Sequence, residues 1–170
     1  MTDTTITSTP NASAPVARTT DHATFSMERT FPQPPARVFG AFAEPASKAA
    51  WFVGPEGAAS AGHTLDFEVG GREHLATAMP DGNLVTFDAT YLDIVPDTRI
   101  IYAYEMTVAG QRISASLASI ELRAAPGGTH LALTEHGIFL DGLDQVGERE
   151  RGTRELLDKL ATHLDEAVSR

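Results

Sequence analysis

The chain has 170 residues, enough for one domain with a hydrophobic core, and a formal net charge of −10. This acidic balance argues against a nucleic-acid-binding stripe and against attraction to an anionic membrane surface. Cysteine is absent, which excludes disulfides, thiolate metal sites and a cysteine nucleophile. No apolar run approaches the ~18 residues of a membrane span, and the N-terminus lacks the pattern of a secretory signal. We therefore expect a cytoplasmic protein.

The first 22 residues are predicted to form a disordered tail. The segment Met1–His22 is rich in Thr, Ser, Ala and Pro. Such a composition buries too little apolar surface to offset the entropy lost on ordering. A plain extension is favoured over a regulatory or targeting segment. The folded domain is then expected to span residues 23–170.

The domain is predicted to begin with a strand and two short helices. Phe25 and Met27 alternate with polar residues in the stretch 23–31, which is typical of a strand. Apolar residues at helical spacing, bounded by prolines, follow in residues 32–45. Residues 46–52 predict a second short helical piece.

Six further strand-like segments follow, separated by turn signals such as Asp81-Gly82 and Gly127-Gly128. They are residues 63–69, 72–79, 84–94, 98–106, 113–122 and 130–139. Together with the first strand they make about seven short, regularly spaced strands. This spacing predicts an antiparallel meander.

One of these segments breaks its own alternation. Ile113 and Leu117 share one parity, whereas Ile120 and Leu122 have the other. A β-bulge within residues 117–119 would bring both pairs to the same face of the sheet.

The chain ends in a predicted long helix from Val146 onward. Its apolar residues form one stripe, with the charged residues mostly off it. The stripe consists of Leu156, Leu157, Leu160, Ala161, Leu164 and Val168. A helix with one apolar face must cover another layer, and the concave face of the sheet is the available partner. The predicted fold class is α+β, a curved antiparallel sheet of about seven strands wrapped around a long C-terminal helix, with two short helices after the first strand.

Several stretches together carry a resemblance to a known family. They are Phe31–Phe52, Val69–Glu73, Pro80–Asn83, Tyr91–Glu105, Gly127–Gly142 and Arg149–Leu164. In this order and spacing the chain resembles the homologues of the activator of the heat-shock protein 90 ATPase, within the START-like (SRPBCC, pollen-allergen-like helix-grip) superfamily. The resemblance implies a START-like helix-grip domain. That superfamily contains lipid and hormone carriers, polyketide cyclases and chaperone regulators, so the fold alone leaves the function open.

A long helix that crosses a curved sheet usually leaves an apolar cavity, which is the default ligand-binding site. The predicted lining is Trp51, Phe52, Phe67, Leu75, Phe87, Tyr91, Tyr102, Tyr104, Phe139 and Leu156. The alternative is that these side chains form an ordinary filled core. Gly152, one turn before Leu156, would widen the mouth of the cavity or let the helix approach Trp51. The alternative is that it lies near the helix start, where glycine costs little.

Glu135 is the candidate for chemistry. It has the same strand parity as Leu131 and Leu133, so a regular strand would point it inward. A buried carboxylate could serve as a general acid or base, with Tyr102 or Tyr104 as a hydrogen-bond donor.

The favoured interpretation of Glu135 is structural. Gly137 follows two residues later and marks a bulge or bend, which would take the carboxylate to the rim of the cavity. A salt bridge to Arg72 or Arg149 is the other structural role. Catalysis would need a complete set of groups, and no spacing in the sequence specifies one.

The six histidines form no metal-ligating motif. They are His22, His63, His74, His130, His136 and His163. Those at 130 and 136 share a strand face, but six residues along a strand separate them by ~20 Å. We expect no metal and no cofactor, and we interpret the glycine pairs as turns.

Three functions remain in view. We favour a non-catalytic binding domain whose cavity takes a hydrophobic or aromatic small molecule. The second is protein interaction, namely regulation of a chaperone ATPase. The third is an enzyme of cyclase or hydrolase type that uses Glu135 with a tyrosine. The protein is expected to be a monomer or homodimer.

Overall fold

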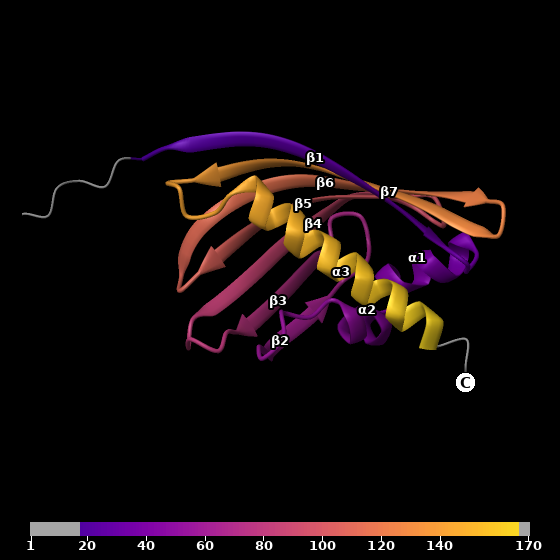
Figure 1. The fold of residues 1–170 in the computed structure, drawn as a ribbon, viewed down its shortest axis with the longest axis horizontal. Helices are drawn as coiled ribbons and strands as arrows, with labels where there is room; N and C mark the ends of the chain where they lie inside the picture. Colours follow the sequence, from indigo (N-terminus) through magenta and orange to yellow (C-terminus); the bar gives the residue numbers. More distant parts are fainter. Residues whose placement is uncertain (1–17, 167–170) are drawn as a thin grey trace, which may run out of the picture.

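A computed structural model describes residues 18–166, which form an α+β fold (Figure 1). In chain order the elements are β1 (Thr20–Phe31), α1 (Pro35–Ala43), α2 (Pro45–Trp51), β2 (Ala59–Leu65), β3 (Arg72–Ala78), β4 (Leu84–Val95), β5 (Arg99–Val108), β6 (Gln111–Ala125), β7 (Gly128–Leu140) and α3 (Val146–Glu166). The predicted helix-grip architecture is confirmed.

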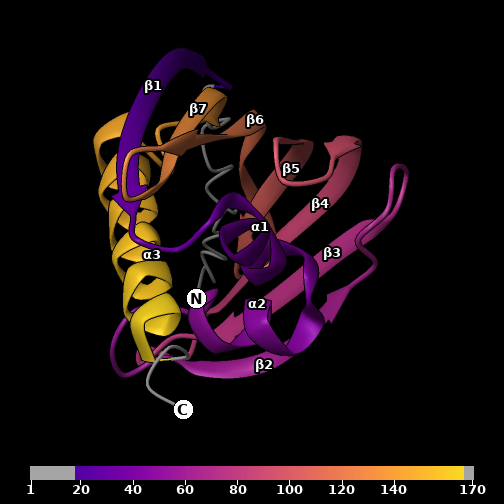
Figure 2. The ribbon, with the colours of Figure 1, turned by 90° about the vertical axis from the view of Figure 1, so that its right-hand side faces the viewer.

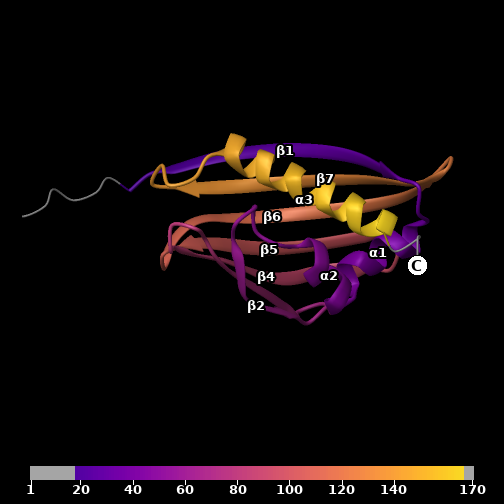
Figure 3. The ribbon, with the colours of Figure 1, turned by 60° about the horizontal axis from the view of Figure 1, so that its bottom comes forward.

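The sheet is antiparallel, with the strand order β1-β7-β6-β5-β4-β3-β2. Each strand from β2 to β6 pairs with its successor, and β1 joins the last strand, β7. Figure 2 shows the sheet curving round the helices, with α3 alongside β1 and β7 and with α2 close to β2. In Figure 3, α3 runs diagonally in front of the sheet, from beside β1 across β7 and β6 toward α1. The space between α3 and the middle strands is where the candidate site lies.

Strand β1 begins earlier than the sequence pattern suggested. Thr20 pairs with Leu140 and His22 with Ile138, so residues 20–22 belong to the sheet. The predicted tail is therefore three residues too long at its C-terminal end, because backbone pairing with β7 holds even polar residues in a strand. Residues 18 and 19 of the predicted tail precede β1, whereas residues 1–17 and Val168 of the predicted helical stripe lie outside the described residues.

Strand β2 also differs from its predicted limits of 63–69. It spans Ala59–Leu65, and the chain turns between Asp66 and Gly71. Gly70 has a φ of 87°, and a Cβ atom on Gly71 would lie 2.2 Å from the carbonyl oxygen of Asp66. The two glycines therefore permit a tight turn that the apolar pattern of the segment concealed.

The two short helices are joined through a single residue. Pro35 and Pro45 each occupy a first-turn position, where the missing N–H costs nothing, and Glu44 ends α1 and precedes α2. The indole Nε1 of Trp51 donates a hydrogen bond to the carbonyl oxygen of Ala41 at 2.8 Å. This bond fixes the angle between the helices and holds the end of α2 over the sheet.

The core lies between α3, α1 and the inner face of the sheet. Leu157, Leu160 and Leu164 of α3 are at most 2% exposed. They pack in one cluster with residues of α1, β1, β6 and β7, including Phe25, Met27, Val38, Phe42, Ile120, Leu122, Leu131 and Leu133. Burial of this apolar surface holds the helix against the sheet. No helix within residues 18–166 is long and apolar enough to cross a membrane.

The bulge predicted within residues 117–119 is wrong. The register between β5 and β6 shifts near Ile113, because Ser114 pairs with Met106 while Arg112 pairs with Thr107. Beyond it β6 alternates regularly, and Leu117 lies on the outer face with 43% of its surface exposed. The inner positions that apolar residues were expected to fill are taken by Ser114 and Ser116. Their hydroxyl groups have partners inside the fold, as described below.

Candidate ligand-binding cavity

A cavity of about 520 Å³ lies between α3 and the concave face of the sheet. It is bounded by the end of α2, by strands β3 to β7, and by α3 from Glu148 to Lys159. Nine of the residues proposed from the sequence line it, namely Trp51, Phe52, Leu75, Phe87, Tyr102, Tyr104, Glu135, Gly152 and Leu156. The volume is within the range of small-molecule sites. That a ligand occupies it stays a prediction.

Three residues of the predicted lining lie elsewhere. The ring of Phe67 packs edge-on against that of Tyr91, with centroids 4.9 Å apart, in the turn beside β4. Tyr91 is 2% exposed, and its hydroxyl donates a hydrogen bond to Glu73, which does not line the cavity. Phe139 is also 2% exposed and packs against the guanidinium of Arg149. Tyr91 and Phe139 are therefore core residues, and Phe67 is a partly buried residue packed against the core.

Aromatic rings form one wall of the cavity. The centroid of Phe87 lies 4.8 Å from that of Tyr104, 5.1 Å from that of Phe52 and 6.3 Å from that of Tyr102. These residues come from β4, β5 and the end of α2, which the sheet curvature brings together. A flat apolar or aromatic molecule could contact the edges and faces of these rings, which are the geometries that aromatic pairs prefer.

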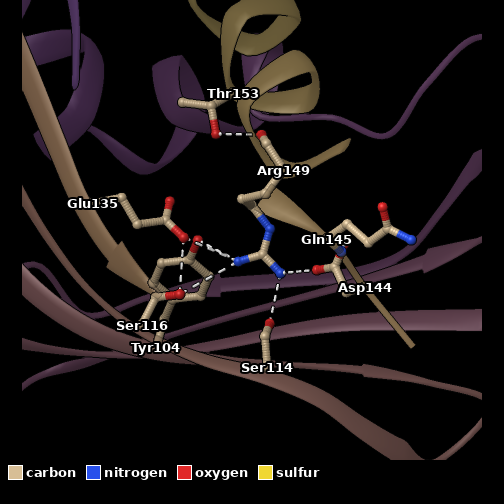
Figure 4. Close-up of polar contacts among 8 residues, drawn as sticks. All are labelled: Tyr104, Ser114, Ser116, Glu135, Asp144, Gln145, Arg149 and Thr153. Atoms are coloured by element: carbon tan, nitrogen blue, oxygen red, sulfur yellow. Dashed lines mark hydrogen bonds and ion pairs between the residues drawn. The ribbon is translucent and has the colours of Figure 1, made fainter. Parts of the chain in front are cut away.

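Arg149, in the first turns of α3, crosses the end of the cavity and binds the sheet (Figure 4). Its Nη1 donates to the Tyr104 hydroxyl at 2.7 Å and to Glu135 Oε1 at 3.1 Å. Its Nη2 donates to Ser114 Oγ at 2.6 Å and to Asp144 Oδ2 at 2.5 Å. These bonds explain why serine occupies the inner positions of β6.

Glu135 is buried, with 3% of its surface exposed. Strand β7 runs on past it without a shift in register, so the predicted bend at Gly137 and the rim position are wrong, whereas the predicted salt bridge to Arg149 is confirmed. The Ser116 hydroxyl donates to Glu135 Oε1 at 2.8 Å. In Figure 4 the other oxygen, Oε2, points away from this bonded cluster.

The cluster shifts the pKa values of Arg149 and Tyr104. Burial alone would lower the pKa of Arg149, but the neighbouring oxygens of Tyr104, Glu135 and Asp144 outweigh burial and raise that pKa. Burial, and then the negative charge of Glu135, raise the pKa of Tyr104, while Arg149 opposes the shift. Arg149 therefore stays a cation and Tyr104 a neutral phenol at physiological pH.

A second buried cluster, which sequence analysis missed, lies beside the other end of the cavity. Glu73 on β3 is 2% exposed and has three partners. The Tyr91 hydroxyl donates to Oε2 at 2.7 Å, His63 Nε2 lies 2.9 Å from Oε1, and Lys48 Nζ lies 3.3 Å from Oε2. The signal was present, because Glu73 has the same strand parity as Leu75.

Lys48 is the member of this cluster that also lines the cavity. It is 6% exposed, and its Nζ lies 4.5 Å from the ring centroid of Phe52 and 5.3 Å from those of Phe42 and Trp51. Burial lowers the pKa of Lys48, and Glu73 only partly offsets this. Burial would raise the pKa of Glu73, but Lys48 and the hydrogen bonds from its other partners lower it.

The mouth of the cavity is bounded by α3 and by the segment after α2. Lys159 Nζ donates to the carbonyl oxygens of Val53 and Gly54, at 3.0 and 2.6 Å. Gly152 lies in the second turn of α3, and a Cβ atom there would have no heavy atom within 4 Å. Of the interpretations of Gly152, the structure therefore favours added room at the cavity. Six helical residues precede it, and the open space around it argues against a close approach to Trp51.

Within residues 18–166 no three His, Cys, Asp or Glu side chains converge as a metal site would require. His130 lies 3.5 Å from Glu28, and the His136 ring lies 2.9 Å from the hydroxyl of Thr24. Both contacts join β7 to β1 on the outer face, away from the cavity.

The chain is similar to a known protein family and to several solved structures. The model of a family described as activator of Hsp90 ATPase homolog 1-like protein matches residues 32–165. A solved structure of a protein from Rhizobium leguminosarum is 44% identical, covering 88% of this chain and 99% of that one, with a TM-score of 0.85. The Mll3558 protein from Rhizobium loti is 45% identical, covering 85% and 99%, with a TM-score of 0.79.

More distant structures share the fold alone. An AHSA1-like protein from Aeromonas hydrophila is 19% identical, with a TM-score of 0.66 over 87% of this chain and 96% of that one. A search of curated proteins finds no significant match.

Proposed function

The chain belongs to the family of activator of Hsp90 ATPase homolog 1-like proteins, and on this basis we propose that it is a non-catalytic binding domain for a hydrophobic or aromatic small molecule. The observation that carries the proposal is the cavity of about 520 Å³ walled by the rings of Phe52, Phe87, Tyr102 and Tyr104. A cavity of this volume with a mainly apolar lining and a few polar groups is the usual form of a small-molecule site.

The polar groups at the cavity suggest a ligand with one polar end. Both hydrogen bonds that Glu135 accepts from Ser116 and Arg149 end on Oε1, which leaves Oε2 for a donor on the ligand. Tyr102 also lines the cavity, and no hydrogen bond joins its hydroxyl to another described side chain. A few such groups within an apolar lining fix the orientation of a bound molecule.

Binding is favoured over catalysis because Glu135 and Arg149 are engaged with the protein itself. The guanidinium has partners on β5, β6, β7 and the segment before α3. A general acid or base must reach the reacting atom of the substrate, and one that moved would break this cluster. We therefore assign the pair to positioning α3 against the sheet at the cavity end.

The first experiment is native mass spectrometry of the purified full chain, followed by denaturation and identification of the released molecule. We expect an apolar or aromatic compound to co-purify or, after it is stripped, the neutral dye N-phenyl-1-naphthylamine to bind with a stoichiometry of one. A protein that retains nothing and binds no apolar probe would overturn the proposal.

A matched pair of variants on α3 locates the binding site. Gly152→Phe places a ring at the cavity and should weaken dye binding by about tenfold or more, because loss of one buried ring face costs at least ~1.4 kcal/mol. Gly147→Phe makes the same change five residues earlier, at a position that does not line the cavity, and should leave binding unchanged. Equal effects of the two variants would place the dye elsewhere.

A further inference from the structure

The chain contains two lysines against eleven arginines, and both lysines line the cavity. The ammonium of Lys159 is occupied by the carbonyl oxygens of Val53 and Gly54. Lys48 has a different environment, with three aromatic rings around its Nζ and, among residues 18–166, an ion pair with the carboxylate of Glu73 alone.

A buried ion pair alone does not require lysine. The planar guanidinium of arginine is weakly hydrated, forms two-point bonds with carboxylates, and is the usual cation in such pairs. Lysine differs in that its amine can lose a proton when it is buried and then act as a nucleophile. Burial lowers the pKa of Lys48, which increases the fraction of neutral amine.

We propose that Lys48 is a covalent attachment site, at which its amine forms a reversible imine with an apolar aldehyde or ketone that enters the cavity. The inference rests on the proposed function, since the carbonyl compound would be the small molecule that the cavity takes. It deepens that function by naming the ligand class and the atom that holds it.

The groups that the reaction needs are beside Lys48. The ammonium proton passes to the pair formed by Glu73 and His63, whose Nε2 lies 2.9 Å from Glu73 Oε1. The free amine adds to the carbonyl carbon and gives a carbinolamine. The same pair returns the proton to the carbinolamine oxygen, which leaves as water while the carbon–nitrogen double bond forms. One carbonyl compound and one amine thus yield one imine and one water, with no oxidant or reductant.

The surroundings of Nζ suit an aromatic carbonyl compound. The rings of Phe42, Trp51 and Phe52 all line the cavity, so an aromatic body bound there would present its carbonyl group close to the amine. These apolar walls also limit access of bulk water, which slows hydrolysis of the imine.

The test is to incubate the full chain with 2-naphthaldehyde and sodium cyanoborohydride, which reduces an imine to a stable secondary amine. Intact mass and peptide mapping then locate the adduct. We expect one adduct, on Lys48. Lys48→Arg keeps a cation beside Glu73 and so preserves the fold, yet should lose the adduct. The matched variant Lys159→Arg, which removes the other cavity amine, should keep it.

Binding without reaction is measured separately, by quenching of the fluorescence of Trp51, the one tryptophan of the chain, with 2-naphthalenemethanol, which lacks the carbonyl group. If the alcohol binds and the aldehyde gives no adduct on Lys48, the covalent site is overturned while the proposed function stands. Equal labelling of Lys159 or the terminal amine would overturn it as well. If neither compound binds and no adduct forms, both proposals fail.

Discussion

Arg149 Nη1 lies 3.1 Å from Glu135 Oε1, and this ion pair joins the start of α3 to the inner face of β7. Both side chains are at most 8% exposed. Removal of one partner leaves an uncompensated buried charge, which typically costs 3–5 kcal/mol. We therefore expect Arg149→Met to lower the free energy of unfolding by about 3–5 kcal/mol, as measured by urea denaturation.

The double variant separates the pair from its parts. Glu135→Leu combined with Arg149→Met removes both charges of this pair and should recover part of the loss, because an apolar pair can replace a buried ion pair. The recovery is partial because Asp144 still loses its ion pair with Arg149. Arg123→Met, in an exposed pair with Glu121, is the control and should cost less than about 1 kcal/mol. A loss at Arg149 no larger than at Arg123 would show that the ion pair has no structural role.

The architecture was predictable because each element carries its own periodicity. Alternation marked the strands, turn glycines separated them, and the leucines of α3 required a concave apolar partner. Most of the cavity lining followed from the same alternation, since Phe87 on β4 and Tyr102 and Tyr104 on β5 belong to middle strands of the sheet. Tertiary context moved the limits of β2, where a pair of glycines bends an apolar segment.

The polar clusters were harder to predict, because the alternation of apolar residues does not show which residues face inward where the interior itself is polar. Ser114 and Ser116 point inward to bond Arg149 and Glu135, so the apolar residues of β6 gave the wrong position for its bulge. Strand alternation correctly predicted that Glu135 points inward. The same alternation, applied to β3, places Glu73 on the inner face. Its pairing with Lys48 depends on α2 and β3 meeting in space, which no local pattern encodes.

Gly137 illustrates a glycine that makes room for a neighbour. A Cβ atom at this position would lie 2.9 Å from Cζ of Phe139, whose ring is buried against Arg149. Gly137→Ala must displace that ring, and we expect a loss of about 1–3 kcal/mol in the free energy of unfolding. An unchanged stability in urea denaturation would mean that the ring moves freely.

Gly152→Ala on α3 is expected to raise the free energy of unfolding, whereas Gly137→Ala lowers it. The added methyl group meets no atom within 4 Å, and alanine is favoured over glycine inside a helix by about 0.5–1 kcal/mol. The free energy of unfolding should rise by that amount while binding of N-phenyl-1-naphthylamine persists. A fall in stability would show that the helix needs glycine for a close approach. The paired measurements on Gly137→Ala and Gly152→Ala serve as controls for each other, since the chemical change is the same.

All three tyrosines of the chain face the interior, and the pKa of each is raised. Burial is the largest cause at every one of them. Glu73 adds to it at Tyr91, Glu135 adds to it at Tyr104, and Tyr104 adds to it at Tyr102. The folded protein therefore keeps three phenolic protons that the unfolded chain releases near the ordinary pKa of 10.0.

The sign of the resulting pH dependence follows from these protons. Above pH 10 the folded state binds more protons than the unfolded state, so stability is fully present below that pH and falls as the pH rises beyond it. Each tyrosine contributes a slope of up to about 1.4 kcal/mol per pH unit. We expect tyrosinate absorbance to stay low until the circular dichroism signal of the fold is lost, and then to rise for all three residues together. Tyrosinate absorbance that develops near pH 10 with the fold intact would show that the phenols are open to solvent, and that the cavity wall is looser than the packing of Phe87 against Tyr104 implies.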